Sequence, residues 1–184
     1  MSRVGNRKLD LPPEVKLEFT ENSLVFSKGD KVRTINYDPM VVKVKLENSI
    51  LSFERANSSK FSNMMQGTLN SLSQGAIIGL VKGFEKKLII DGAGYKATKK
   101  DKTLVLALGY SKEISLKIPE DIEMELSSSG KDLTLKSHNK EVLGEFAALI
   151  KKQRPVEPYK LKGIRIEGDI VVRKAGKSAE KSKK

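Results

Sequence analysis

Residues 103–109 read Thr103-Leu104-Val105-Leu106-Ala107-Leu108-Gly109, a pattern that residues 23–29 anticipate 80 positions earlier as Ser23-Leu24-Val25-Phe26-Ser27-Lys28-Gly29. The same shift aligns Pro39 with Pro119, and it aligns Val42, Val44 and Leu46 with Ile122, Met124 and Leu126. Several matches in one order indicate an internal duplication. The alternative is that two unrelated antiparallel meanders share a common pattern.

Either interpretation divides the chain into two domains, residues 1–82 and 83–184, with a boundary near Lys82–Phe84. The 184 residues suffice for two small domains, each with a modest core of its own. After a small insertion the repeat continues, because Asn57 meets Asn139 and each Asn precedes a stretch of helical periodicity.

Alternation of apolar and polar residues predicts β-strands in the second half of the chain. The alternating segments are Ile114–Ile118, Ile122–Leu126 and Leu133–Leu135. Strands of this kind have one buried and one solvated face, which is typical of antiparallel sheets.

Each half is predicted to end in one helix with an apolar face. In the second half this face consists of Val142, Leu143, Phe146, Leu149 and Ile150, and Asn139 is the expected N-cap. In the first half it consists of Phe61, Met65, Leu69, Leu72, Ala76 and Leu80. Because neither helix can bury its apolar face alone, we expect an α+β fold: two similar domains, each an antiparallel sheet with one helix on a face, followed by a basic C-terminal extension.

Positive charge is concentrated at the two ends of the chain. The sequence has 35 Lys+Arg and 23 Asp+Glu, a net charge of +12. Residues 151–184 carry a net charge of +8 and residues 1–8 carry +3, whereas the 142 residues between them carry +1. The ends are therefore the parts expected to meet a polyanion.

The sequence has little that could support catalysis. Cysteine is absent and His138 is the only histidine, so a thiolate nucleophile, a Cys/His pair and a histidine pair for a metal are excluded. Gly92-Ala93-Gly94 lacks the third glycine of a dinucleotide-binding motif and precedes a strand-like segment. We expect no enzyme, no metal and no cofactor. The sequence also has no apolar stretch suited to a membrane span or a signal peptide.

The C-terminal segment combines cations with prolines, glycines and an aromatic residue. Pro155 and Pro158 predict an extended lead-out from the second helix. Lys160 and Lys162 are then expected on the same side of an extended strand. Tyr159 is equally suited to stacking on a base or to packing within the domain.

A second group of cations, Arg173, Lys174 and Lys177, follows a short apolar strand expected at Ile170–Val172. Lys supplies a point charge, Arg a planar fork for two phosphate oxygens, and Gly lets the backbone approach a partner closely. This combination favours nucleic acid over an anionic membrane, which would require an amphipathic basic helix or a lipid anchor. RNA is favoured over DNA because neither helix presents base-reading side chains on a basic face.

Several motifs resemble those of the bacterial large ribosomal subunit protein six family. The segment Pro158-Tyr159-Lys160-Leu161-Lys162-Gly163-Ile164-Arg165 is similar to that family's Pro-Tyr-Lys-Gly-Lys-Gly-Ile-Arg. Upstream, Gly92-Ala93-Gly94-Tyr95-Lys96-Ala97 and Leu108-Gly109-Tyr110-Ser111 resemble its Gly-Val-Gly-Tyr-Arg-Ala and Val-Gly-Tyr-Ser. Arg154-Pro155 fits the lead-in to the signature, and Met1-Ser2-Arg3-Val4-Gly5 fits the usual start.

The resemblance implies two α+β domains from a duplication and a structural role in the large ribosomal subunit, in the cytoplasm. It also implies direct binding to large-subunit ribosomal RNA near the sarcin–ricin loop, where elongation factors dock, with other ribosomal proteins as neighbours. The residues that it places at or near RNA are Tyr159, Lys160, Lys162, Gly163 and Arg165, to which we add Arg3 and Arg154 from the matching start and lead-in.

One residue departs from the signature. Leu161 stands where the family has a glycine, so its side chain is expected to alter how closely the backbone approaches RNA, or to point into the domain. A non-ribosomal RNA chaperone or adaptor of the same build is the alternative function.

Overall fold

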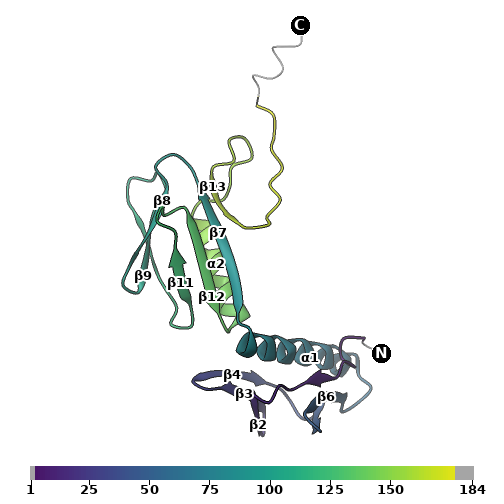
Figure 1. Cartoon of the computed structure of the whole chain (residues 1–184). Coiled ribbons are helices and arrows are strands. Elements are labelled where there is room, and N and C mark those ends of the chain that lie inside the picture. The colour runs from purple at the N-terminus through teal and green to yellow at the C-terminus, as the bar shows by residue number, and fades with distance from the viewer. Residues whose placement is uncertain (1–2, 177–184) are drawn as a thin grey trace. The chain divides into compact units, whose positions relative to one another are not determined.

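The computed structural model describes residues 3–176 and has the predicted α+β architecture (Figure 1). The described chain forms two compact units. The first contains residues up to Gly83 together with His138–Lys140, and the second contains Phe84–Ser137 and the residues from Glu141 onward.

The first unit contains two three-stranded antiparallel sheets and one helix. One sheet has the order β2-β3-β4 and the other the order β1-β6-β5. The elements are β1 (Leu9–Asp10), β2 (Lys16–Thr20), β3 (Ser23–Lys28), β4 (Lys31–Asn36), β5 (Val42–Glu47), β6 (Ile50–Arg55) and α1 (Lys60–Val81).

The second unit repeats this plan and extends it by one strand. A three-stranded sheet has the order β10-β9-β8, and a four-stranded sheet has the order β11-β12-β7-β13. The elements are β7 (Phe84–Asp91), β8 (Lys96–Lys100), β9 (Thr103–Ala107), β10 (Ile114–Lys117), β11 (Glu123–Leu126), β12 (Asp132–Ser137), α2 (Lys140–Gln153) and β13 (Gly163–Ile166).

The two units match strand by strand, in agreement with the predicted duplication. β2 and β8 start 80 residues apart, as do β3 and β9. The order β1-β6-β5 in the first unit corresponds to β7-β12-β11 in the second. The strand without a counterpart is β13, which pairs with the edge of β7. The second copy therefore differs from the first by an added strand that comes from the basic C-terminal segment.

The helix of the second unit packs largely as predicted. Leu143, Phe146 and Ile150 are buried in a core with residues of β7, β9 and β12. Leu149 is an exception, because it is 44% exposed, and Ala147 is buried in its place. The prediction for Leu149 was wrong because the contact face of α2 is narrower than the apolar stripe in the sequence.

The helix of the first unit buries a partly polar face, which the sequence did not predict. Leu69, Ala76 and Leu80 are buried as expected, but Phe61 is 56% exposed and Leu72 is 39% exposed. The buried positions on this helix instead include Ser62, Gln66, Asn70 and Ser73. Two predicted core positions of α1 are therefore on its surface.

The polar face of α1 holds the N-terminal segment of the chain. The amide nitrogen of Gln66 donates to the carbonyl oxygens of Phe53 at 2.8 Å and Gly5 at 3.1 Å. The amide nitrogen of Asn70 donates to the carbonyl of Arg7 at 2.7 Å. Buried backbone carbonyls need such donors, which is why amide side chains occupy positions that the periodicity assigned to solvent.

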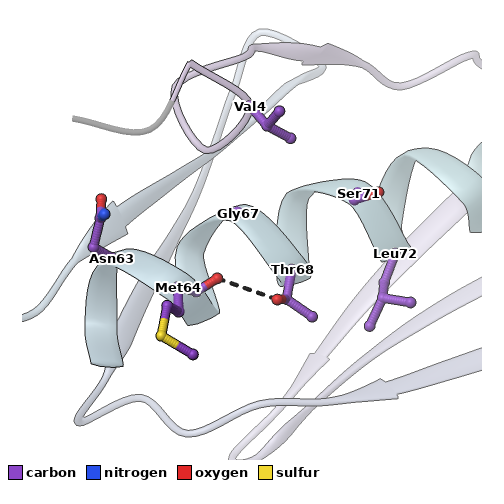
Figure 2. Close-up of a pocket in the computed structure, with 7 residues that line it drawn as sticks. All are labelled: Val4, Asn63, Met64, Gly67, Thr68, Ser71 and Leu72. Carbon is purple, nitrogen blue, oxygen red and sulfur yellow. Dashed lines mark hydrogen bonds between the residues drawn. The ribbon is translucent and has the colours of Figure 1, made fainter. Parts of the chain in front are cut away.

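The N-terminal turn also borders an open groove along α1 (Figure 2). Val4 lies over the helix, and the groove is lined by the uncharged residues Val4, Asn63, Met64, Gly67, Thr68, Ser71 and Leu72. A phosphate group would find no cation among these lining residues.

Replacing Gln66 with Met is expected to lower the free energy of unfolding of the first unit by about 2 kcal/mol. Met has a similar length, but it leaves the carbonyls of Phe53 and Gly5 without their donor. Denaturant unfolding followed by hydrogen exchange at amides of the first unit measures the change. Ser71→Ala, an exposed substitution on the same helix, is the control and should change stability by less than about 0.5 kcal/mol; equal stability of both variants would contradict the role of Gln66.

Candidate nucleic-acid interface

The C-terminal segment is built into the core of the second unit through β13. Ile164 is fully buried and pairs with Ile90 of β7. Its backbone N–H donates to the carbonyl of Arg154 at 2.8 Å, and it forms a parallel bridge with Pro155. The residues on either side of β13 are therefore held at fixed positions on the unit.

Residues 157–162 form a tight loop before β13. The N–H of Glu157 donates to the carbonyl of Lys162 at 2.9 Å, and the N–H of Leu161 donates to the carbonyl of Glu157 at 3.0 Å. Lys160 and Lys162 are both exposed. The predicted extended strand through these lysines is wrong, because the two hydrogen bonds close the segment into a loop.

The chain after β13 folds back onto this loop. The N–H of Lys174 donates to the carbonyl of Pro158 at 2.9 Å, and Nε of Arg173 donates to the carbonyl of Tyr159 at 3.3 Å. The predicted strand at 170–172 is also wrong: these residues pair with no strand within residues 3–176, and Ile170 is 93% exposed. The return of the chain instead brings two basic stretches together.

We call the resulting group of exposed side chains, Tyr159, Lys160, Lys162, Arg173 and Lys174, the C-terminal basic surface. Among residues 3–176, none of its four cations forms an ion pair with an acidic side chain. Exposed cations without an acidic partner can donate hydrogen bonds to phosphate oxygens without first breaking an ion pair. The arrangement thus suits a polyanion.

Asp169 fixes the turn by which the chain leaves β13. Its carboxylate accepts from Nζ of Lys151 at 2.8 Å and from the N–H of Ile166 at 3.0 Å. These hydrogen bonds, the one from Lys151 foremost, lower the pKa of Asp169 below its usual value. Asp169 therefore remains ionised at neutral pH and ties the returning chain to α2.

Close packing against Pro155 and Val156 requires a glycine at position 163. It is buried with φ +137°, and a Cβ at this position would lie 2.6 Å from the carbonyl oxygen of Pro155 and 2.7 Å from Cα of Val156. The sequence suggested that glycines here bring the backbone close to a partner. The structure gives Gly163 another reason, since it lets β13 pass against the lead-out segment.

Leu161 has the left-handed conformation that favours glycine. Its φ is +59°, and its side chain is half-buried. This conformation costs a non-glycine residue about 1–2 kcal/mol. The glycine at the matching position of the signature thus has a physical explanation, and partial burial of Leu161 agrees with the expectation that its side chain points into the domain.

Arg154 lies against two tyrosine rings. Its guanidinium carbon is 4.9 Å from the centroid of Tyr110 and 5.9 Å from that of Tyr95. Hydrogen bonding to Tyr110 and the nearby Tyr95 raise the pKa of Arg154 above its usual value. Three motifs of the resemblance, around residues 92–95, 108–111 and 154–155, therefore meet in one place. The contact of Tyr110 with Arg154 was not predicted from the sequence, although Tyr110 lies in the Gly-Tyr-Ser motif that resembles the family.

The remaining predicted site residues lie elsewhere. Arg165 is in β13, on the strand face opposite to Ile164, and its Nε is buried without a partner within the described chain. Arg3 is exposed in the first unit. Lys177 is outside the described residues.

Residues 3–176 contain no group of acidic or histidine side chains that could hold a metal ion. None of their helices has the length and apolar character needed to cross a bilayer.

Comparison with known proteins gives the family. A family model described as Ribosomal protein L6 matches residues 92–167. The large ribosomal subunit protein uL6 of a Nitratiruptor species is 38% identical over 181 residues, covering 98% of this chain and 100% of that protein. The chain belongs to the ribosomal protein L6 family. The uL6 proteins of Mesoplasma florum, 39% identical over 98% of this chain, and of Onion yellows phytoplasma, 37% identical over 100% of it, agree; each is covered over its full length.

Membership of the L6 family confirms several predictions. L6 proteins are structural constituents of the large ribosomal subunit and not enzymes, which decides against a non-ribosomal adaptor. As a ribosomal protein, the chain works in the cytoplasm within the ribosome, together with ribosomal RNA and other ribosomal proteins.

Replacing Gly163 with Ala is expected to destabilise the second unit by about 2–4 kcal/mol, since the new methyl group meets backbone atoms and φ is unfavourable. Denaturant unfolding measures the loss. Gly176→Ala is the matched control because no atom lies within 4 Å of its Cβ position. A Gly163→Ala protein as stable as the Gly176→Ala protein would show that the lead-out segment is not held against β13.

Proposed function

We propose that this L6 protein binds large-subunit ribosomal RNA directly through the C-terminal basic surface. The observation that carries the proposal is the arrangement of Lys160 and Lys162 beside Arg173 and Lys174, fixed by backbone hydrogen bonds and free of acidic partners among residues 3–176. This surface lies on the one segment that the second copy of the fold has and the first copy lacks.

Physical chemistry supports a phosphate backbone as the ligand. A cation that neutralises a phosphate releases condensed counterions, which is the main source of affinity for RNA. The ordered loop avoids much of the entropy loss that a free basic tail would incur on binding. The half-exposed ring of Tyr159 can add a stacking contact with a base or sugar.

The other predicted residues take supporting places in this proposal. Arg3, in the first unit, and Lys177 add phosphate contacts outside the C-terminal basic surface. Arg165 reaches the RNA from β13. Arg154 and Gly163 act through the shape of the segment, because the first lies against tyrosine rings and the second against the backbone of Pro155.

We further propose that the bound RNA is near the sarcin–ricin loop, so that elongation factors dock nearby. This position is supported by the signature motif at residues 158–165 and by the chain's membership of the L6 family. In the same proposal, residues 1–82 and 83–184 are the two domains. The second anchors the protein on RNA, and the first contacts neighbouring ribosomal components.

Neutralising two cations of the surface tests the proposal. Lys160→Gln with Lys162→Gln is expected to weaken binding of large-subunit ribosomal RNA about tenfold at low salt. The four cations of the C-terminal basic surface should contribute about −3 to −4 to the slope of log affinity against log salt, and the double variant should reduce the magnitude of that slope by about 1.5. Fluorescence anisotropy over a series of salt concentrations measures both quantities.

A control pair of substitutions removes the same charge elsewhere. Lys100→Gln with Lys117→Gln changes two exposed lysines of β8 and β10 in the same unit. This pair should leave the affinity and the slope nearly unchanged. If both pairs weakened binding equally, the attraction would come from net charge and the proposed surface would be refuted. Truncation is a poorer test, because Ile164 belongs to the core.

A further inference from the structure

Tyr110 is a half-exposed aromatic residue that contacts the end of α2, just before the segment that carries the C-terminal basic surface. It lies in the loop between β9 and β10, and 48% of its surface is exposed. Its hydroxyl donates to the carbonyl oxygen of Gln153 at 3.1 Å. The guanidinium of Arg154 is 4.9 Å from the centroid of its ring. The ring is therefore held at its polar end and by a cation, while much of it is open to solvent.

Arg154 also lies near the ring of Tyr95, which is closely surrounded by backbone. The ring of Tyr95 lies 5.9 Å from the guanidinium carbon of Arg154. A Cβ at Gly92 would lie 2.4 Å from this ring, and a Cβ at Gly109 would lie 2.9 Å from it. The two glycines thus let the backbone close around Tyr95. Both have positive φ values, +157° and +75°, and at Gly109 that value also favours glycine for conformational reasons.

The same backbone links this aromatic group to the cations. Gln153 accepts the hydrogen bond from Tyr110, and the carbonyl of the next residue, Arg154, accepts from Ile164 of β13. The loop with Lys160 and Lys162 begins three residues later, at Glu157. A half-exposed ring and a set of unpaired cations are consequently fixed to one short segment of the second unit.

We propose that Tyr110 is a stacking site for an unpaired RNA base. An aromatic side chain strengthens binding about 5- to 150-fold per stacked base, and a ring that is already held in place loses little conformational freedom on binding. Arg154 is then a positioning residue that holds Tyr110, and not a clamp for phosphate. This inference rests on the proposed function, because the cations hold the backbone of the same RNA.

The test compares two RNA probes: a hairpin with 2-aminopurine at an unpaired loop position and a fully paired duplex of the same length. Tyr110→Leu is expected to weaken hairpin binding about tenfold, to abolish quenching of the 2-aminopurine fluorescence, and to leave duplex binding and its salt dependence unchanged. Tyr110→Phe keeps the ring and should stay within about threefold of the wild type.

Arg154→Lys separates positioning from charge. Lys keeps the positive charge but lacks the planar group that lies against the rings. We expect weaker hairpin binding with an unchanged salt slope, whereas a phosphate clamp would lose affinity equally for hairpin and duplex. Phe19→Leu replaces an aromatic residue of the first unit that is 47% exposed, and it should have no effect on either probe.

The outcomes distinguish this inference from the proposed function. If the wild-type protein binds both probes in a salt-dependent manner and Tyr110→Leu behaves like it, the stacking site is refuted alone. An equal loss on both probes also refutes it. If the wild-type protein binds neither probe with salt dependence, the proposed function fails first. Thermal unfolding of each variant is measured in parallel, and Arg154→Lys decides the question should Tyr110→Leu be unstable.

Discussion

Burial of Ile164 against β7 is the contact on which the functional surface depends. This side chain is fully buried, and its strand, β13, pairs with the edge of β7. The corresponding strand of the first unit, β1, has no such added strand among the described residues. The cations before and after β13 repel one another, so without this anchor they would move apart. Because β13 is fixed, the loop at 157–162 and the returning chain at 173–174 meet through backbone hydrogen bonds.

The duplicated fold separates the residues that maintain the structure from the residues that we propose bind RNA. Each copy buries its own core between sheet and helix, and the two cores use corresponding strands. The 142 residues between the charged ends carry a net charge of only +1, whereas residues 151–184 carry +8. The addition of a basic segment to one copy thus changes the surface chemistry while leaving the packed layers of both copies alike. In the proposed function, this segment gives a nearly neutral scaffold its affinity for RNA.

The α+β fold, the repeat and the L6 resemblance could be predicted because they rest on local periodicity and on contiguous motifs. The predictions failed where the structure depends on contacts between residues far apart in sequence or on an unusual backbone conformation. Gln66 and Asn70 look solvated in a helical pattern, yet they are buried because carbonyls of the N-terminal segment need donors. The extended strand expected through Lys160 and Lys162 became a loop, since Leu161 adopts a left-handed conformation. The meeting of Arg154 with Tyr95 and Tyr110 joins residues far apart in sequence, and no single-sequence pattern records such contacts.

The most direct measurement is a cryo-EM structure of this protein's own large ribosomal subunit at a resolution that shows side chains. We expect phosphate oxygens within about 3 Å of the side-chain nitrogens of Lys160, Lys162 and Arg173. We also expect β13 to remain paired with β7 in the assembled particle. A particle in which these three cations face solvent, while the RNA contacts the outer sheet face with Glu85 and Glu125, would contradict the proposed function.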